Sequence, residues 1–194
     1  TGDETTDKIL LAAVEVVGRA GLAHTTMLRI CRRARISAGA VGGRFSTPLT
    51  IVTSAFNQVI EFVVNENVTK FPNSGKDDLW RRYSESIVAA LSDSRLPWRL
   101  FRREMLIASR HNAVIQNRVK QGFLRTDEFL KKSLLDFGMN EFAVSACAEF
   151  NRYLTEGIAI LKDFDLPVEK VNHGEISKFV ISQAPTMLAK STLN

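Results

Sequence analysis

Cysteine, histidine and proline are all scarce in this chain. Its 194 residues include two cysteines, three histidines and five prolines. Cys31 and Cys147 match no metal-binding spacing, which predicts buried free thiols in a reducing compartment. The histidines are scattered, and the sequence contains no motif for a nucleophile, a zinc site or a phosphate-binding glycine loop. We therefore expect no enzyme, no cofactor and no metal site.

Long apolar runs are absent as well. No stretch approaches the roughly 20 apolar residues of a membrane span. The first residues, TGDETTDK, are neither basic nor apolar enough for a signal peptide. These absences predict a cytoplasmic protein without a membrane partner. A hydrophobic content of 45% is ordinary for a folded domain and allows a sizeable core.

The pattern of apolar residues predicts an all-helical protein. Apolar positions recur at intervals of three or four, and alternation of β-branched residues is rare. The clearest break is the run of turn-forming residues at 71–75, FPNSG. The expected helices lie at about residues 3–20, 26–33, 38–44, 48–69, 76–92, 97–110, 113–137, 141–162 and 173–190.

Three signals for the start of a helix fall close together near the N-terminus. Thr25 or Thr26 can cap one helix, Ser37 can cap a second, and Thr47 followed by Pro48 can open a third. Two short helices around a tight turn, followed by a third helix, are the layout of a DNA-binding helix-turn-helix.

The charge around these helices is of one sign. No Asp or Glu occurs between Glu15 and Glu61. The same stretch contains Arg19, Arg29, Arg32, Arg33, Arg35 and Arg44. Such a cluster suits a phosphate backbone, although a helical hairpin with a solvated basic edge would have the same composition.

A set of positions in this region matches the spacing of a known sequence pattern, without a gap from Gly21 to Phe45. These positions are Ile9, Ala12, Ala13, Gly21, Thr25, Thr26, Ile30, Ala34, Ser37, Gly39, Val41, Phe45 and Thr47. In this pattern the chain resembles the tetracycline-repressor-like (TetR) family of bacterial transcription regulators. The resemblance implies a helix-turn-helix DNA-binding domain at residues 1–47. A helical ligand-binding and dimerisation domain would follow at residues 48–194, with its first helix bridging the two.

The chain also departs from the family pattern. Gly42 replaces a Tyr that usually touches the DNA backbone, and Pro48 replaces a Lys that reaches a phosphate. Arg35 replaces the turn Gly, and Cys31 replaces a small Ala. These changes leave open an alternative, a family member with a degraded DNA-binding domain that acts as a ligand sensor or protein-binding module without specific operator binding.

The resemblance implies that the second short helix enters the major groove. Its small side chains offer hydroxyl and methyl contacts to bases, whereas arginines are expected at phosphates. The predicted DNA-binding residues are Thr26, Arg35, Ser37, Ala38, Ala40, Val41, Arg44 and Thr47. Because Gly39, Gly42 and Gly43 fall in an expected helix of about seven residues, that helix should be loosely formed without DNA.

The second domain is rich in aromatic residues, since the chain contains 12 Phe. The resemblance implies a pocket for a small, largely apolar effector, with Arg102, Glu104 or His111 orienting any polar end. The predicted lining residues are Phe101, Met105, Phe123 and Phe150. Any one of these rings could instead belong to the ordinary core.

Apolar stripes along the last two expected helices predict a homodimer that forms a four-helix bundle. The predicted interface residues are Leu154, Gly157, Ile158, Leu161, Ile176, Phe179 and Val180. The same stripes could also pack within one chain. The expected function is a ligand-responsive repressor that binds a palindromic double-stranded operator as a dimer.

Overall fold

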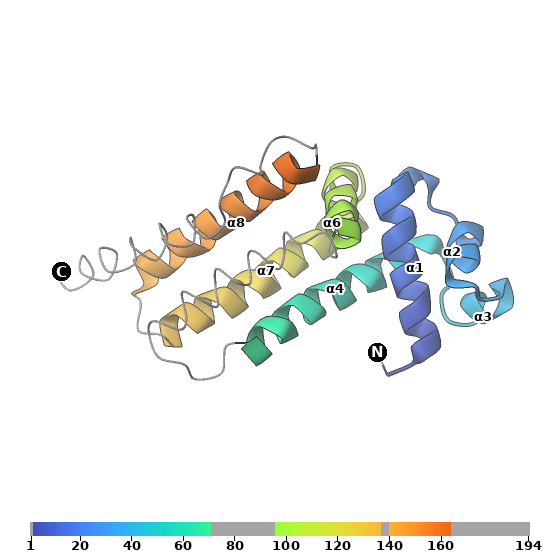
Figure 1. The fold of residues 1–194 in the computed structure, drawn as a ribbon, viewed down its shortest axis with the longest axis horizontal. Coiled ribbons are helices and arrows are strands. Elements are labelled where there is room, and N and C mark those ends of the chain that lie inside the picture. Colours follow the sequence, from blue (N-terminus) through green and yellow to red (C-terminus); the bar gives the residue numbers. More distant parts are fainter. Residues whose placement is uncertain (1, 71–95, 137–139, 164–194) are drawn as a thin grey trace. The chain divides into compact units, whose positions relative to one another are not determined.

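The computed structural model describes residues 2–70, 96–136 and 140–163, and within these ranges it contains helices and turns but no strand (Figure 1). The predicted all-helical fold is confirmed. The chain divides into two compact units, one formed by residues 1–63 and 96–125 and the other by residues 64–95 and 126–194. The predicted functional boundary between residues 47 and 48 stays a prediction. Within the described ranges, no helix is long and apolar enough to cross a membrane.

The first unit opens with a helix, a tight turn and two short helices. These elements are α1 (Glu4–Ala20), a 3₁₀ turn (Leu22–His24), α2 (Met27–Ala34) and α3 (Ala38–Gly42). Helix α1 begins after Asp3, whose carboxylate accepts a hydrogen bond from the Thr5 N–H at 3.0 Å. It ends at Gly21, where φ is +79°, a conformation that favours glycine. The helices expected at about residues 3–20 and 26–33 are confirmed to within one residue at each end.

Three longer helices contribute to the same unit. They are α4 (Pro48–Lys70) up to residue 63, the whole of α6 (Leu96–Ser109) and α7 (Ala113–Asp136) up to residue 125. Helix α6 begins at Leu96, one residue before the start of the helix expected at about residues 97–110. Pro97 does not prevent this, because a proline in the first turn removes only an N–H that has no partner within the helix.

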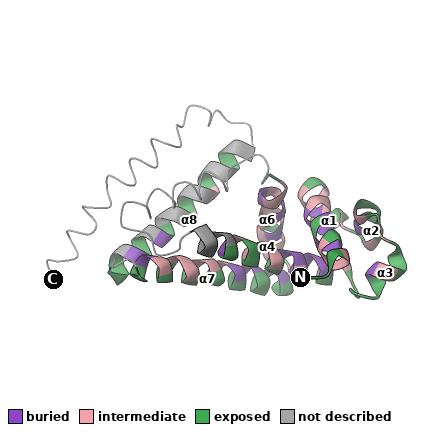
Figure 2. Cartoon of the chain, turned by 60° about the horizontal axis from the view of Figure 1, so that its bottom comes forward, coloured by how far each residue is buried: buried purple, intermediate pink, exposed green. Residues whose placement is uncertain are grey.

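The core of the first unit is built from one face of each helix (Figure 2). Helix α1 packs against both α2 and α6. The largest fully buried side chains of this core are Phe56, Phe101, Ile9, Ile30, Ile51, Met105, Ile115, Val17, Val41 and Val52. Helices as short as α2 and α3 are marginal alone, so their structure depends on this shared core.

Two glycines allow close helix approaches within this unit. A Cβ on Gly122 of α7 would lie 2.6 Å from Cε1 of Phe56 on α4. A Cβ on Gly18 of α1 would lie 3.1 Å from the carbonyl oxygen of Pro97 at the start of α6. Both distances are shorter than ordinary van der Waals contact, so a side chain at either position would displace its neighbour.

The second unit contains the end of α4, the end of α7 and helix α8 (Glu141–Asp163). Val64, Leu134, Val144 and Ala148 are its buried apolar residues in the described part. Arg152 of α8 forms an ion pair with Asp127 of α7. The helices expected at about residues 76–92 and 173–190 lie outside the described residues.

Candidate nucleic-acid interface

The three predicted capping residues all cap helices. Thr26 Oγ1 accepts a hydrogen bond from the Arg29 N–H at 3.3 Å, and Ser37 Oγ accepts one from the Ala40 N–H at 3.2 Å. Thr47 and Thr50 bond reciprocally, each backbone N–H donating to the other hydroxyl at 3.2 and 3.1 Å. The starts of α2, α3 and α4 are therefore fixed by local hydrogen bonds.

The turn between α2 and α3 is closed by two backbone hydrogen bonds. The Arg35 N–H donates to the Arg32 carbonyl at 3.3 Å, and the Ile36 N–H donates to the Cys31 carbonyl at 3.1 Å. This Schellman arrangement places Arg35 in the left-handed region, with φ 58° and ψ 41°. Arginine is strained there, because its Cβ crowds the backbone where a glycine would not. The Arg35 side chain is exposed.

The outer face of α3 is open and carries small side chains. Ser37 and Ala38 are exposed, and Ala40 is half-buried. A Cβ added at Gly39 or Gly42 would meet no atom within 4 Å. The surface is therefore smooth enough for another molecule to approach the backbone closely.

Two features of α3 differ from the sequence expectation. Val41 is fully buried in the core, where it anchors α3 and cannot reach a duplex, so we remove it from the predicted DNA contacts. The helix has 5 residues rather than about seven, because Gly43 already serves as its C-cap.

Arg44 is held beside α3 by two partners. Its Nε donates to Asp3 Oδ2 at 3.1 Å, and its Nη1 donates to the Ala40 carbonyl at 3.2 Å. The hydrogen bond from the Thr6 hydroxyl, followed by that from Arg44, lowers the pKa of Asp3 from 3.8 to about 2. The N-cap of α1 is thus also an acidic partner of a predicted phosphate contact, which sequence reasoning missed.

The predicted effector-binding residues lie in different surroundings. Phe101 and Met105 are fully buried in the core of the first unit, and Phe123 is partly buried against the same core. The ring of Phe101 lies 6.4 Å from that of Phe56, centroid to centroid. The side chain of Phe150 lies outside the described residues. The effector pocket therefore stays a prediction.

Glu104 joins α6 to the end of α1. Its Oε2 accepts a hydrogen bond from the Leu22 N–H at 3.4 Å and lies 3.1 Å from the position of a Cβ on Gly21. From the sequence, Glu104 is one of three candidates to orient the polar end of an effector. In the structure it contacts the connection that leads into α2, and only the glycine at position 21 gives a local sign of this close approach.

The predicted dimer interface is described only in part. Gly157 of α8 is exposed, and Leu161 keeps 43% of its surface exposed. Tyr153 and Ile160 on the same helix are also exposed. The remaining predicted residues lie outside the described side chains: Leu154, Ile158, Ile176, Phe179 and Val180.

The described side chains offer little for a metal or a redox reaction. Within them, no group of three or more His, Cys, Asp or Glu is placed to hold a metal ion. Cys31 is a buried free thiol on α2, whereas the side chain of Cys147 lies outside the described residues. Cys31 therefore serves as a small apolar residue of the core.

Comparison with known proteins places this architecture among solved structures. No protein-family model and no curated protein matches the chain. A transcriptional regulator from Rhodococcus sp. Rha1 is 15% identical, with a TM-score of 0.73 over 92% of this chain and 96% of that one. SmeT in its triclosan complex is 21% identical, with a TM-score of 0.71 over 94% of this chain and 91% of SmeT.

A member of the TetR family from Streptomyces coelicolor A3 is 17% identical, with a TM-score of 0.69 over 91% of this chain and 97% of that one. At these identities the likeness concerns the fold, and it agrees with the fold that the sequence pattern implied. The chain has the fold of a TetR-family protein.

Proposed function

We propose that this protein is a transcription regulator that binds double-stranded DNA through α2 and α3. The observation that carries the proposal is the open face of α3. This helix begins at the capping serine Ser37 and lies in the sequence between two arginines, Arg35 and Arg44. No acidic residue occurs in the sequence between Glu15 and Glu61 to repel phosphates from this stretch.

Each exposed residue of the region has a defined role in this proposal. Ser37 supplies a hydroxyl to base edges, and the methyl groups of Ala38 and Ala40 pack against thymine methyls. Arg35 and Arg44 bind phosphates. Thr26 and Thr47 lie at the starts of α2 and α4, where free N–H groups also favour a phosphate.

The protein acts as a homodimer in this proposal. The exposed apolar residues of α8, including Ile160 and Leu161, support a second copy as the partner of that helix. The predicted interface also includes Leu154, Gly157, Ile158, Ile176, Phe179 and Val180. A two-fold dimer presents two α3 helices to half-sites about 34 Å apart or a multiple of that distance, so the operator is palindromic.

A small apolar effector releases the operator, which makes the protein a repressor. SmeT, a protein of this fold, holds triclosan in its solved structure. Helix α6 carries two of the predicted effector-binding residues, Phe101 and Met105, and also Glu104, which bonds to the Leu22 N–H. An effector that displaces α6 would pull on the connection into α2. It would shift the equilibrium between the DNA-binding and the released conformation by no more than the difference in its affinity for the two.

Selection of bound duplexes from a random pool tests the proposal. We expect enrichment of a palindrome that outcompetes bulk DNA. Titration of the selected duplex at several salt concentrations should then show a slope that falls by about one in Arg44→Ala. Arg118→Ala is the matched control, because Arg118 is an exposed arginine on α7 and its loss changes the net charge equally. An unchanged slope in Arg44→Ala would remove Arg44 from the interface.

Binding that depends on salt but enriches no sequence would contradict the operator-binding proposal. That outcome would favour the alternative in which the helix-turn-helix domain no longer recognises an operator. The departures at Gly42, Pro48 and Arg35 are the sequence features behind this alternative.

A further inference from the structure

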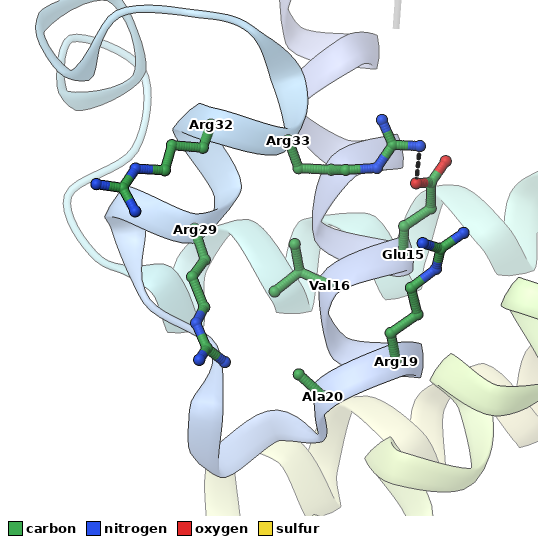
Figure 3. A pocket seen from close by; sticks show the side chains of 7 residues that line it. All are labelled: Glu15, Val16, Arg19, Ala20, Arg29, Arg32 and Arg33. Atoms are coloured by element: carbon green, nitrogen blue, oxygen red, sulfur yellow. Dashed lines mark ion pairs between the residues drawn. The ribbon is translucent and has the colours of Figure 1, made fainter.

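A groove lies between α1 and α2 (Figure 3). Its volume is about 430 Å³, which falls within the range of small-molecule sites. Helix α1 contributes Glu15, Val16, Arg19 and Ala20 to its lining, and helix α2 contributes Arg29, Arg32 and Arg33. None of these residues is among the individual DNA contacts predicted above, although three of them lie on α2.

The chemistry of the groove is cationic at its edge and apolar at its floor. Val16 and Ala20 face the space between the helices, and the side chains of Arg19, Arg29 and Arg33 lie around them, whereas that of Arg32 extends away from Val16 (Figure 3). Arg33 forms an ion pair with Glu15, which neutralises the acidic residue of the lining. Arg19 and Arg32 form no ion pair with the part of the chain that the structure describes. The groove therefore keeps an excess of positive charge.

The helix dipole accounts for some of these arginines but not for all of them. Arg19 lies in the last turn of α1, and Arg32 and Arg33 lie in the last turn of α2, where a cation is favourable. Arg29 lies in the first turn of α2, where the dipole disfavours a cation. Its Nη1 donates to the His24 carbonyl at 3.0 Å, which fixes the guanidinium at the edge of the groove.

We propose that the α1–α2 groove binds a phosphorylated organic molecule of nucleotide size. Guanidinium forks match phosphate oxygens in a bidentate geometry, and several of them suit a ligand with more than one negative charge. The apolar floor of Val16 and Ala20 receives the ring or chain of the same ligand. The site stands on its own geometry and does not depend on operator binding. The phosphate groups come either from a free ligand or from a nucleic acid end.

The test uses the full chain, with adenosine triphosphate and inorganic triphosphate as probes. Methyl NMR of Val16 and Ala20 reports occupancy of the groove directly, and calorimetry gives the affinity. We expect adenosine triphosphate to shift both methyl signals and to bind more tightly than inorganic triphosphate. Equal affinity for the two probes would overturn the role of the apolar floor. Unshifted methyl signals would overturn the site as a whole.

Two double variants distinguish specific binding in the groove from non-specific electrostatic attraction of the anion to the protein surface. Arg19→Gln with Arg29→Gln should weaken binding of adenosine triphosphate at least about tenfold, because two charged hydrogen-bond donors are lost. Arg110→Gln with Arg118→Gln removes the same charge from exposed positions outside the groove and should change the affinity less than about twofold. Equal weakening in both double variants would overturn the proposal.

A short duplex without an operator distinguishes the two sources of phosphate. If the duplex displaces adenosine triphosphate and shifts the Val16 methyl signal, the groove takes phosphates from DNA. If the duplex leaves that signal unchanged while adenosine triphosphate shifts it, the groove takes a free phosphorylated ligand. Either result supports a phosphate site, and neither requires that the selection experiment succeed.

Discussion

Glycines serve opposite purposes at the α4–α7 contact and on α3. At Gly122 a Cβ would lie 2.6 Å from Phe56, so the packing of the chain itself explains the glycine. At Gly39 and Gly42 a Cβ would meet nothing within 4 Å, although glycine weakens a helix by about 1 kcal/mol relative to alanine. Nothing within the described chain requires these two glycines. The difference directs attention to a surface outside the chain, which in our proposal is the DNA duplex.

The largest effect is expected at the internal contact. Gly122→Ala should lower the free energy of unfolding by about 1 to 3 kcal/mol, because the new methyl group overpacks the space beside Phe56. Urea denaturation measures the change. Gln121→Ala, at the exposed neighbouring position on α7, is the control, since it adds no buried methyl group and alanine favours the helix. Destabilisation of the same size in the control would mean that helix packing at Gly122 is not the cause.

The next effect separates stability from binding on α3. Gly39→Ala should raise the free energy of unfolding by up to about 1 kcal/mol, because alanine favours a helix and the position is open. The same variant should bind the selected duplex at least about tenfold more weakly, since the added methyl blocks close approach. Denaturation and DNA titration on one preparation provide both values. If DNA affinity is retained, the comparison between the two glycine regions loses its explanation.

At the turn between α2 and α3, a variant of Arg35 also separates an effect on stability from an effect on DNA binding. Arg35→Gly should stabilise the fold by about 1 kcal/mol, because glycine adopts the left-handed backbone at φ 58° without strain. DNA affinity should fall and the salt slope should decrease by about one. Arg35→Lys keeps the charge, so its slope should stay near that of the wild type. A slope unchanged by glycine would show that the strain at Arg35 serves no phosphate contact.

The smallest effect is expected at Asp3. Asp3→Asn keeps a capping oxygen and removes the charge that pairs with Arg44, so DNA affinity should rise by up to about fivefold. Fluorescence titration with the selected duplex measures this gain. Reduced affinity in Asp3→Asn would mean that Asp3 positions Arg44 for DNA instead of competing with it.

The same variant gives a pH test. The pKa of Asp3 is lowered from 3.8 to about 2, first by the hydrogen bond from Thr6 and then by that from Arg44. The ionised carboxylate therefore favours the folded state above pH 3.8, and this preference is lost as the pH falls through 2. The difference in stability between wild type and Asp3→Asn should narrow over this range in acid denaturation. If the difference in stability between wild type and Asp3→Asn stays constant over this pH range, titration of Asp3 does not cause it.

Local features of the interface could be predicted from the sequence, whereas distant pairings could not. Thr26, Ser37 and Thr47 bond to groups three residues away, so their caps are visible in the sequence as residue types at fixed offsets. The burial of Val41 was missed because a helix of 5 residues is too short to show an apolar period.

Long-range contacts explain the rest of what the sequence did not reveal. Asp3 and Arg44 are 41 residues apart, and Leu22 and Glu104 are 82 residues apart. No local pattern links the members of either pair, because the packing of separate helices brings them together. The helices and their order were predictable for the described residues, but the acidic partner of Arg44 and the role of Glu104 required the structure.

The hydrogen bond between Glu104 and the Leu22 N–H also limits how segments of this protein can be transferred to another protein. Helix α6 and residues 113–125 belong to the same compact unit as the N-terminal helices, although they follow them by a long stretch of chain. A chimaera that transfers only residues 1–47 to another protein would leave Phe101 and Met105 behind and uncover the face of α1 that packs on α6. A graft of the first compact unit must therefore carry both of its segments, residues 1–63 and 96–125.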